Sequence, residues 1–202
     1  MSTASRSHLS SGVELVVIIA VALVLALLIQ AFVVKPYRIP STSMEPTLTI
    51  GQRVLVNRVG THFAKPHVGE VVVFHPPKDA ESQICGAAHP QGAPCPRSEP
   101  QMASENFIKR IVAGPGDLIT IHGGHVTRNG KLEADPYTRA CGTGADSCDF
   151  PTALRIPPGM WFMMGDNRGE SDDSRFWGPV PTKWIIGGAF ATYWPLGRIG
   201  SL

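Results

Sequence analysis

One long apolar run near the start of the chain restricts its fold more than any other feature. Residues 13–34 are apolar almost throughout, interrupted only by Glu14 and Gln30. About 20 such residues are needed for a helix to cross a bilayer core, where a helix satisfies its own backbone hydrogen bonds. A cleaved signal peptide is the alternative, but its apolar part is shorter and ends at small residues. The sequence therefore predicts an uncleaved transmembrane helix over residues 13–34, after a short polar tail at residues 1–12.

The rest of the chain has the composition of a turn-rich β domain. The 21 Gly and 18 Pro of the whole chain favour short strands joined by tight turns over a helical bundle. A net charge of +2 is too small to indicate a nucleic-acid partner. Short β-branched or apolar stretches bounded by turn residues predict the strands. They cover residues 51–58, 69–74, 106–112, 118–121, 161–164 and 184–194. We therefore expect residues 35–202 to form a mainly β domain.

Two segments interrupt this pattern, and each holds two of the four cysteines. Residues 76–105 are poor in large apolar side chains and are expected to form an inserted, solvent-exposed loop. Residues 123–157 contain an Asn-Gly hairpin signal and are expected to form a small β excursion. No C-x-x-C pair is present. In an extracytoplasmic domain, two local disulfides, Cys85–Cys95 and Cys141–Cys148, are favoured among three pairings, whereas four free thiols suit a cytosolic protein.

A hydroxyl-rich segment follows the apolar run. Within residues 40–48, Ser41 and Ser43 lie between two prolines, which push the residues before them towards extended conformations. Such a segment suits a nucleophile that meets an extended chain, although an ordinary Ser/Thr loop is the alternative. Only about nine residues separate the apolar run from Ser43, a reach of about 30 Å at most. The candidate nucleophile, and therefore its substrate, should lie close to the membrane.

The predicted strand at residues 106–112 contains a candidate general base. Lys109 shares one strand face with Phe107 and Ile111, because side chains alternate across a strand. Burial between apolar residues destabilises an ammonium group and lowers its pKa. A lysine that extends to solvent at a sheet edge is the alternative. A buried Lys109 would be partly neutral, as a base must be.

Together these segments resemble bacterial type I signal peptidases, the membrane-anchored serine proteases that remove signal peptides from exported preproteins. The resemblance rests on four features in order: the apolar run, residues 40–48, residues 107–110 leading to a Pro-Gly-Asp turn, and the charged segment at residues 165–178. The inserted segment at residues 76–105 has no dependable counterpart in that family. The resemblance implies a largely antiparallel β fold with a Ser–Lys site beside the membrane.

The resemblance also implies roles for individual residues. Ser43 matches the nucleophile and Lys109 the general base, while Ser41 matches the hydroxyl that completes an oxyanion hole with the backbone N–H of Ser43. The supporting residues comprise a serine that hydrogen-bonds to the lysine, two charged pairs, and the methionine after the nucleophile. They are, in that order, Ser171, Asp173 with Arg175, Arg110 with Asp166, and Met44. The chemistry requires no metal and no cofactor.

The resemblance further implies partners and location. The partners are signal peptides of secretory preproteins and membrane lipid, with no nucleic acid and no metal. A single-pass protein of the cell membrane is expected, with residues 35–202 on the extracytoplasmic face and residues 1–12 in the cytoplasm; charge counting alone does not decide this orientation. Two rivals remain. One is a soluble Ser–Lys peptidase such as a self-cleaving repressor, and the other is an anchored β module that only binds or assembles.

Overall fold

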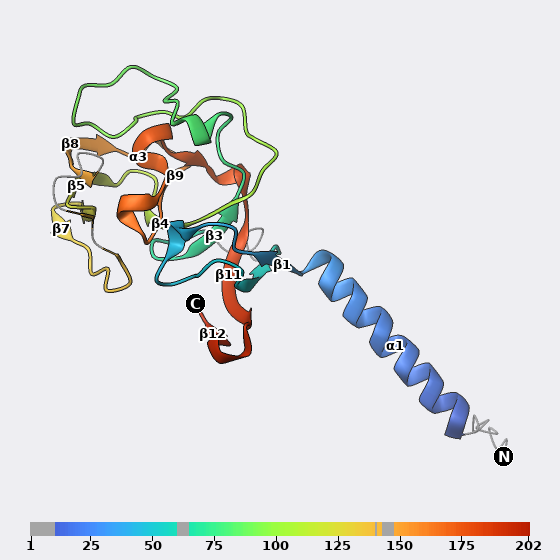
Figure 1. The fold of residues 1–202 in the computed structure, drawn as a ribbon. Helices are drawn as coiled ribbons and strands as arrows, with labels where there is room; N and C mark the ends of the chain where they lie inside the picture. Colours follow the sequence, from blue (N-terminus) through green and yellow to red (C-terminus); the bar gives the residue numbers. More distant parts are fainter. Residues whose placement is uncertain (1–10, 60–64, 140, 143–147) are drawn as a thin grey trace, which may run out of the picture.

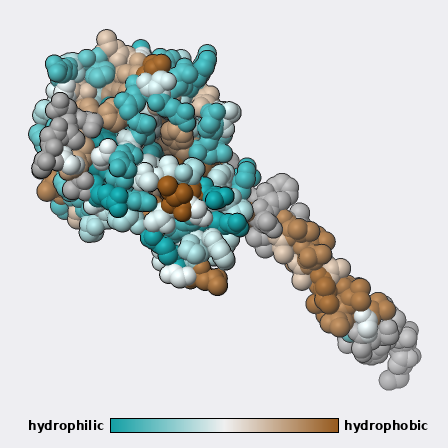
Figure 2. All heavy atoms as spheres, viewed as in Figure 1, coloured by the Kyte–Doolittle hydropathy of each residue, from teal (hydrophilic) through white to brown (hydrophobic). Residues whose placement is uncertain are grey.

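A long helix projects from a β domain (Figure 1). The computed structural model describes residues 11–59, 65–139, 141–142 and 148–202. Helix α1 spans Ser11–Phe32, and its large apolar side chains between Val13 and Leu27 are exposed (Figure 2). Among the described residues, no helix is both long and apolar enough to cross a membrane. The predicted membrane anchor therefore stays a prediction.

The larger sheet contains eight strands in the described part of the chain, and its strand pairs are antiparallel. The order across the sheet is β1-β2-β11-β3-β4-β9-β10, with β12 beside β11. The strands are β1 Val34–Arg38, β2 Arg53–Asn57, β3 Val71–Phe74, β4 Phe107–Ala113, β9 Met160–Met164, β10 Val180–Pro181, β11 Ile185–Trp194 and β12 Gly200–Ser201. The prediction of a mainly antiparallel β fold is confirmed.

A smaller antiparallel sheet packs beside the larger one (Figure 1). Its order is β7-β6-β5-β8, and its strands are β5 Leu118–His122, β6 His125–Arg128, β7 Lys131–Leu132 and β8 Phe150–Arg155. Short helices connect the strands of the two sheets. They are η1 Thr42–Met44, η2 Ala80–Ser82, η4 Arg168–Glu170, α3 Ser174–Trp177, η5 Thr182–Trp184 and η6 Leu196–Arg198.

The segment that carries the candidate nucleophile packs against a hydrophobic core. Ile39, Met44 and Leu48 are almost fully buried and pack in one cluster with Val73 of β3 and Ile108 of β4. Each buried side chain of this size stabilises the packed state by about 1.5–3 kcal/mol. The hydroxyl-rich segment is thus held against β4, the strand that carries Lys109.

The expectation that residues 76–105 form a solvent-exposed loop is wrong in part. Cys95 is fully buried and Ser98 is nearly so, and the N–H of Cys95 donates to the carbonyl of Arg175 at 2.9 Å. Composition misses this because the buried groups are small and pack against the 175–178 segment through backbone contacts. Both predicted disulfides, Cys85–Cys95 and Cys141–Cys148, are present.

Candidate active site

Ser43 lies in η1, beneath the surface of a cleft. The residue is 7% exposed, and its Oγ lies 3.2 Å from the Oγ of Ser41. The carbonyl of Ser43 accepts a hydrogen bond from the N–H of Asn167 at 3.0 Å. Because one hydroxyl can donate to the other, the two serines form a small hydroxyl pair at the base of the cleft.

The cleft has a volume of about 540 Å³. Residues 37–41 form one side, and β4 with the segment before it forms another. Ser43 and Lys109 both line it. A volume of this size is typical of a ligand site in a protein and accommodates several residues of a peptide. The cleft therefore brings together the two side chains that the sequence singled out most strongly.

Lys109 is buried at the wall of this cleft, so the alternative of a solvent-extended lysine is wrong. It is 4% exposed, and it forms no hydrogen bond or ion pair with any residue in the described part of the chain. Burial lowers its pKa from the ordinary value of 10.5 to about 8, although Asp173 and Asp172 partly oppose this by favouring the ammonium. About a tenth of Lys109 is consequently neutral at pH 7.

Asp173 and Arg175 form a fully buried ion pair behind the site. Arg175 Nε lies 2.8 Å from Asp173 Oδ1, and its Nη2 lies 2.9 Å from Oδ2. The second carboxylate oxygen also accepts from the N–H of Gly165 at 3.0 Å. Burial alone would raise the pKa of Asp173, but Arg175, together with Lys109 and the N–H of Gly165, outweighs it and the pKa is lowered. The pair therefore stays charged and fixes the path of residues 165–175.

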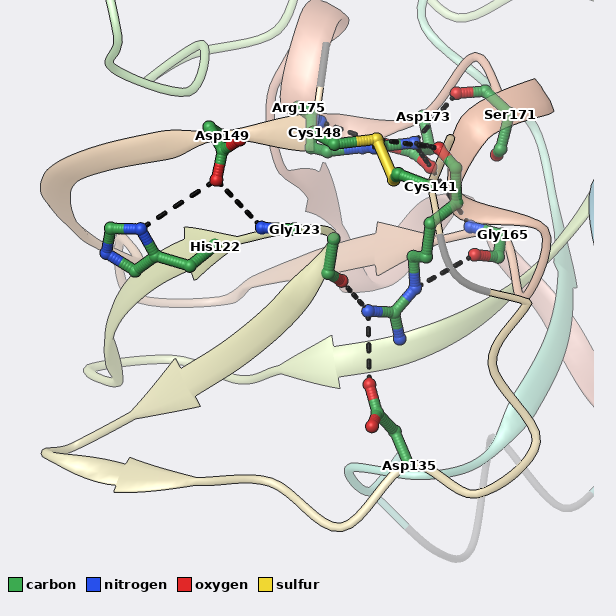
Figure 3. Close-up of a disulfide and its surroundings, with 12 residues drawn as sticks. His122, Gly123, Asp135, Cys141, Cys148, Asp149, Gly165, Ser171, Asp173 and Arg175 are labelled. Carbon is green, nitrogen blue, oxygen red and sulfur yellow. Dashed lines mark hydrogen bonds and ion pairs between the residues drawn. A yellow bond between two sulfur atoms is a disulfide. The ribbon is translucent and has the colours of Figure 1, made fainter. Parts of the chain in front are cut away.

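A second buried arginine, Arg168, joins the two sheets, and sequence reasoning did not single it out. Its Nε donates to the carbonyl of Gly165 at 3.2 Å, and its Nη1 lies 3.2 Å from Asp135 and also donates to the carbonyl of Gly124. The Cys141–Cys148 disulfide lies against this region (Figure 3). In the sequence, the high density of charged residues in the 165–175 segment is the one sign that some of its side chains form ion pairs inside the protein.

The other predicted pair, Arg110 and Asp166, ties three segments together. Arg110 Nε and Nη2 donate to the two oxygens of Asp166 at 2.9 and 2.6 Å. The hydroxyl of Thr47 donates to the same carboxylate at 2.5 Å, and Arg110 Nη1 donates to the carbonyl of Gly69 at 2.7 Å. The pair thereby fixes the chain that follows Ser43 against β4.

The predicted hydrogen bond from Ser171 to Lys109 is wrong. The Ser171 Oγ is buried and has no hydrogen-bond partner among the described residues. This hydroxyl lies instead against Gly165, where a Cβ atom would come within 2.3 Å of it and within 2.4 Å of the carbonyl oxygen of Ser43. Gly165 permits this close approach, so the hydroxyl of Ser171 lies near the backbone carbonyl of Ser43.

Two further residues position the nucleophile segment and were missed from the sequence. The side-chain amide of Asn167 donates to the carbonyl of Thr42 at 3.2 Å. The hydroxyl of Thr42 donates to Glu170 at 3.2 Å. These contacts, with the Asn167 N–H on the Ser43 carbonyl, hold η1 from the η4 side. The polarity of residues 165–175 was visible in the sequence, but their partners were not.

The histidines that the structure describes lie away from this arrangement. His67 pairs with Glu70, His122 with Asp149, and His125 with Asp135. None of these three lines the cleft. His62 lies outside the described residues. A serine hydroxyl and a partly neutral amine in one cleft are therefore the groups available for nucleophile and base.

Comparison with known proteins agrees with this chemistry. The model of the family described as "Signal peptidase, peptidase S26" matches residues 12–194. A probable signal peptidase I-1 of Synechocystis is 39% identical over 94% of this chain and 86% of its own length. A signal peptidase I of Leptolyngbya laminosa is 35% identical over 91% and 80%. A signal peptidase IB of Staphylococcus aureus is 31% identical over 90% and 89%.

The fold, the cleft and these similarities define a hydrolase of the serine peptidase class. The chain belongs to the signal peptidase family, peptidase S26.

Proposed function

We propose that this chain is a membrane-anchored serine endopeptidase that removes N-terminal signal peptides from exported preproteins. Ser43 is the nucleophile and Lys109 the general base. The observation that carries the proposal is a buried lysine with a pKa of about 8 in the same cleft as a serine hydroxyl. Family membership supports the reaction, and the cleft supports the roles of the two residues.

The reaction requires a base because a serine hydroxyl is a weak nucleophile near neutral pH. Lys109 removes the proton from Ser43 as Ser43 attacks the scissile carbonyl. The protonated Lys109 then donates to the leaving amine, which departs as the mature protein. Lys109 next activates water, which releases the signal peptide from the acyl-enzyme. Burial supports this cycle, since it keeps part of the Lys109 population neutral at the start.

The oxyanion is held by the backbone N–H of Ser43 and the hydroxyl of Ser41. The 3.2 Å separation of the two Oγ atoms supports this assignment because it puts the second hydroxyl beside the attacking oxygen. Loss of one such donor costs about 3–4 kcal/mol of transition-state stabilisation. The ion pairs Asp173–Arg175 and Arg110–Asp166 act indirectly in this proposal, by fixing the segments around the cleft.

An extended substrate can pair with the open edge of β4. The pairing of β4 with β9 begins at Arg110. In the described part of the chain, Phe107, Ile108 and Lys109 pair with β3 on one side and with no strand on the other. A peptide that lies along this edge gains main-chain hydrogen bonds, and pockets for its alternate side chains give specificity. By family resemblance, the small residues are the first and third before the cut.

Residues 13–34 anchor the protein in the membrane in this proposal, with residues 1–12 in the cytoplasm and residues 35–202 on the extracytoplasmic face. The exposed apolar side chains of α1 support the anchor, since an isolated helix of this kind gains no burial from the β domain. The two disulfides support an oxidising compartment for the domain.

The test is cleavage of a synthetic signal-peptide substrate by the detergent-solubilised protein. Wild type is expected to cut after a small residue, whereas Ser43→Ala, Lys109→Ala and Lys109→Arg are expected to be inactive. Arginine fails because it does not give up its proton near neutral pH. Lys131→Arg, at an exposed strand residue, is the matched control.

Three outcomes contradict the proposal in different ways. An active Lys109→Arg enzyme removes Lys109 as the base. Cleavage by the Ser43→Ala protein removes the nucleophile. If wild type binds the peptide and leaves every preprotein and peptide uncut, the chain is a membrane-anchored binding or assembly module instead.

A further inference from the structure

The cleft has an acidic wall, and part of it comes from the segment that the family resemblance leaves without a counterpart. Glu81 in η2 and Glu105 just before β4 belong to residues 76–105, and both line the cleft. Glu170 and Asp172 line it as well. A second hollow of about 180 Å³ shares Glu81 and Glu105 with the cleft and adds Asp79. We call this continuous depression, with its five carboxylates, the acidic groove.

The five carboxylates of the acidic groove outnumber its basic side chains, since Arg38 and Lys109 are the two basic residues in its described lining. None of its five carboxylates forms an ion pair with a residue in the described part of the chain. Five of the sixteen Asp and Glu residues are thus gathered at one depression of a chain whose net charge is +2. Such a concentration in a concave site focuses a negative potential on whatever enters it.

The inserted segment holds its part of this wall in a fixed place. The side-chain amide of Gln83 donates to Asp172 and ties the inserted segment to residues 170–172. The base of the insertion is closed by hydrogen bonds from Lys78 N–H to the Gln101 carbonyl and from Ala103 N–H to the Pro76 carbonyl, both 2.8 Å. The acidic side chains are therefore presented by a tethered segment and not by a free loop.

A separate observation marks the groove as a binding site. Lys109 lines it, is 4% exposed and has no hydrogen-bond partner among the described residues. An unpartnered, buried polar group facing a cleft is stabilised when a ligand supplies its partner. The cleft that holds Lys109 therefore also holds Glu81, Glu105, Glu170 and Asp172.

The spacing along the chain gives the distance from the cut to the acidic wall. Glu105 precedes Lys109 by four residues, which is about 13 Å of extended chain. A peptide that lies along the open edge of β4 advances by the same amount per residue. The side chain near Glu105 and Glu81 is therefore about three to five residues from the scissile bond.

We infer that the acidic groove selects substrates with a lysine or arginine about three to five residues from the cleaved bond, on the side that lies along Glu81 and Glu105. This inference rests on the proposed peptidase function and specifies its substrate class. The insertion at residues 76–105 is in this view a specificity element.

The test uses two readouts on peptides that differ at one position. Each peptide contains a cleavage sequence with small residues and has Lys, Gln or Glu at a single varied position. The varied position runs from two to six residues on either side of the cut. kcat/KM is measured for wild type, Glu81→Gln, Glu105→Gln and the double variant. Glu99→Gln is the matched control, because Glu99 lies in the same insertion but lines neither hollow. Binding of the same peptides to Ser43→Ala is measured by fluorescence anisotropy.

For wild type we expect a Lys-over-Glu preference of about 5- to 10-fold at low salt, at positions on one side only. The preference should shrink with added salt, fall to about twofold or less in the double variant, and persist in Glu99→Gln. Equal values for Lys and Glu peptides, or a preference that survives the double variant, would overturn the inference while cleavage itself still stands. If no peptide is cut, the anisotropy measurement tests the inference without the peptidase function. Equal affinities of the Ser43→Ala protein for the Lys and Glu peptides would overturn the inference.

Discussion

The pH dependence of cleavage tests the role of Lys109 most directly. With its ordinary pKa of 10.5, about 0.03% of the lysine would be neutral at pH 7, and with a pKa of about 8 this fraction is about 9%. Burial therefore raises the concentration of active base by about 300-fold. We expect kcat/KM to rise about tenfold per pH unit below pH 8 and to level off above it.

A charge near Lys109 should move this midpoint in a defined direction. Asp172 is exposed and favours the ammonium form, so Asp172→Asn should lower the pKa of Lys109. Because the carboxylate is screened by solvent, we expect a shift of about half a pH unit or less, smaller still at high salt. Glu99→Gln, which removes the same charge away from the cleft, should leave the midpoint unchanged.

The assay is kcat/KM of a fluorogenic signal-peptide substrate from pH 6 to pH 10 at constant ionic strength. The side-chain carbon shift of Lys109, followed by NMR in the Ser43→Ala protein, gives the pKa of the same group without turnover. A flat profile would refute the reasoning. So would a kinetic midpoint below pH 7 while the NMR midpoint stays near 8, because the base would then be another group.

The same burial has a consequence for stability. Since the pKa of Lys109 is lower in the folded protein, the folded state disfavours its charge, and this cost is fully present below pH 8. The cost amounts to about 3 kcal/mol and disappears as pH rises towards 10.5. Lys109→Met should therefore unfold at higher urea than wild type at pH 6.5, and this gap should narrow by pH 10. A gap that widens with pH would contradict the sign of the shift.

Three other changes have distinct expected outcomes. Ser41→Ala should lower kcat by about 100- to 1,000-fold with little change in KM, measured on the same peptide, because one oxyanion donor is lost. Ser171→Ala should leave the free energy of unfolding unchanged or raise it by up to about 1 kcal/mol, because the Ser171 hydroxyl has no hydrogen-bond partner among the described residues. Ser174→Ala should lower the free energy of unfolding by about 1 kcal/mol, because the Ser174 hydroxyl accepts a hydrogen bond from the N–H of Met163. Both values are measured by urea titration. Replacing Cys141 and Cys148 by alanine should cost about 2–3 kcal/mol of stability for a cross-link over seven positions, measured by thermal unfolding.

Each of these has a contradicting result. Full activity of Ser41→Ala would reassign the oxyanion donor. A large loss of activity in Ser171→Ala, with unchanged stability, would indicate that Ser171 hydrogen-bonds to Lys109 during turnover. An unchanged melting temperature in the double cysteine variant would mean that the disulfide does not restrict the unfolded chain.

Local sequence patterns were sufficient to predict the strands and to identify Ser43 and Lys109 as the principal candidate catalytic residues. The predicted strands at residues 51–58, 69–74 and 106–112 lie within about two residues of β2, β3 and β4. Alternation of side chains across a strand depends only on neighbouring residues, so it places Lys109 on an apolar face before any fold is known. The cysteine spacing predicted both disulfides for the same reason.

Tertiary structure alone decided how the site is supported. Thr47 meets Asp166 across 119 positions of sequence, and Thr42 meets Glu170 across 128. The misplaced hydrogen bond of Ser171 shows the limit of residue-by-residue resemblance, because the close approach at Gly165 determines where that hydroxyl points.

The sequence by itself determined the elements, the order of the motifs, and the serine and lysine to examine. Packing determined the degree of burial that sets the pKa of Lys109, and it turned an inserted segment of unremarkable composition into the acidic wall of the cleft. The physical reason is that propensity and periodicity are properties of adjacent residues. Desolvation and electrostatic potential instead sum over every group that the fold brings near, whatever its place in the chain.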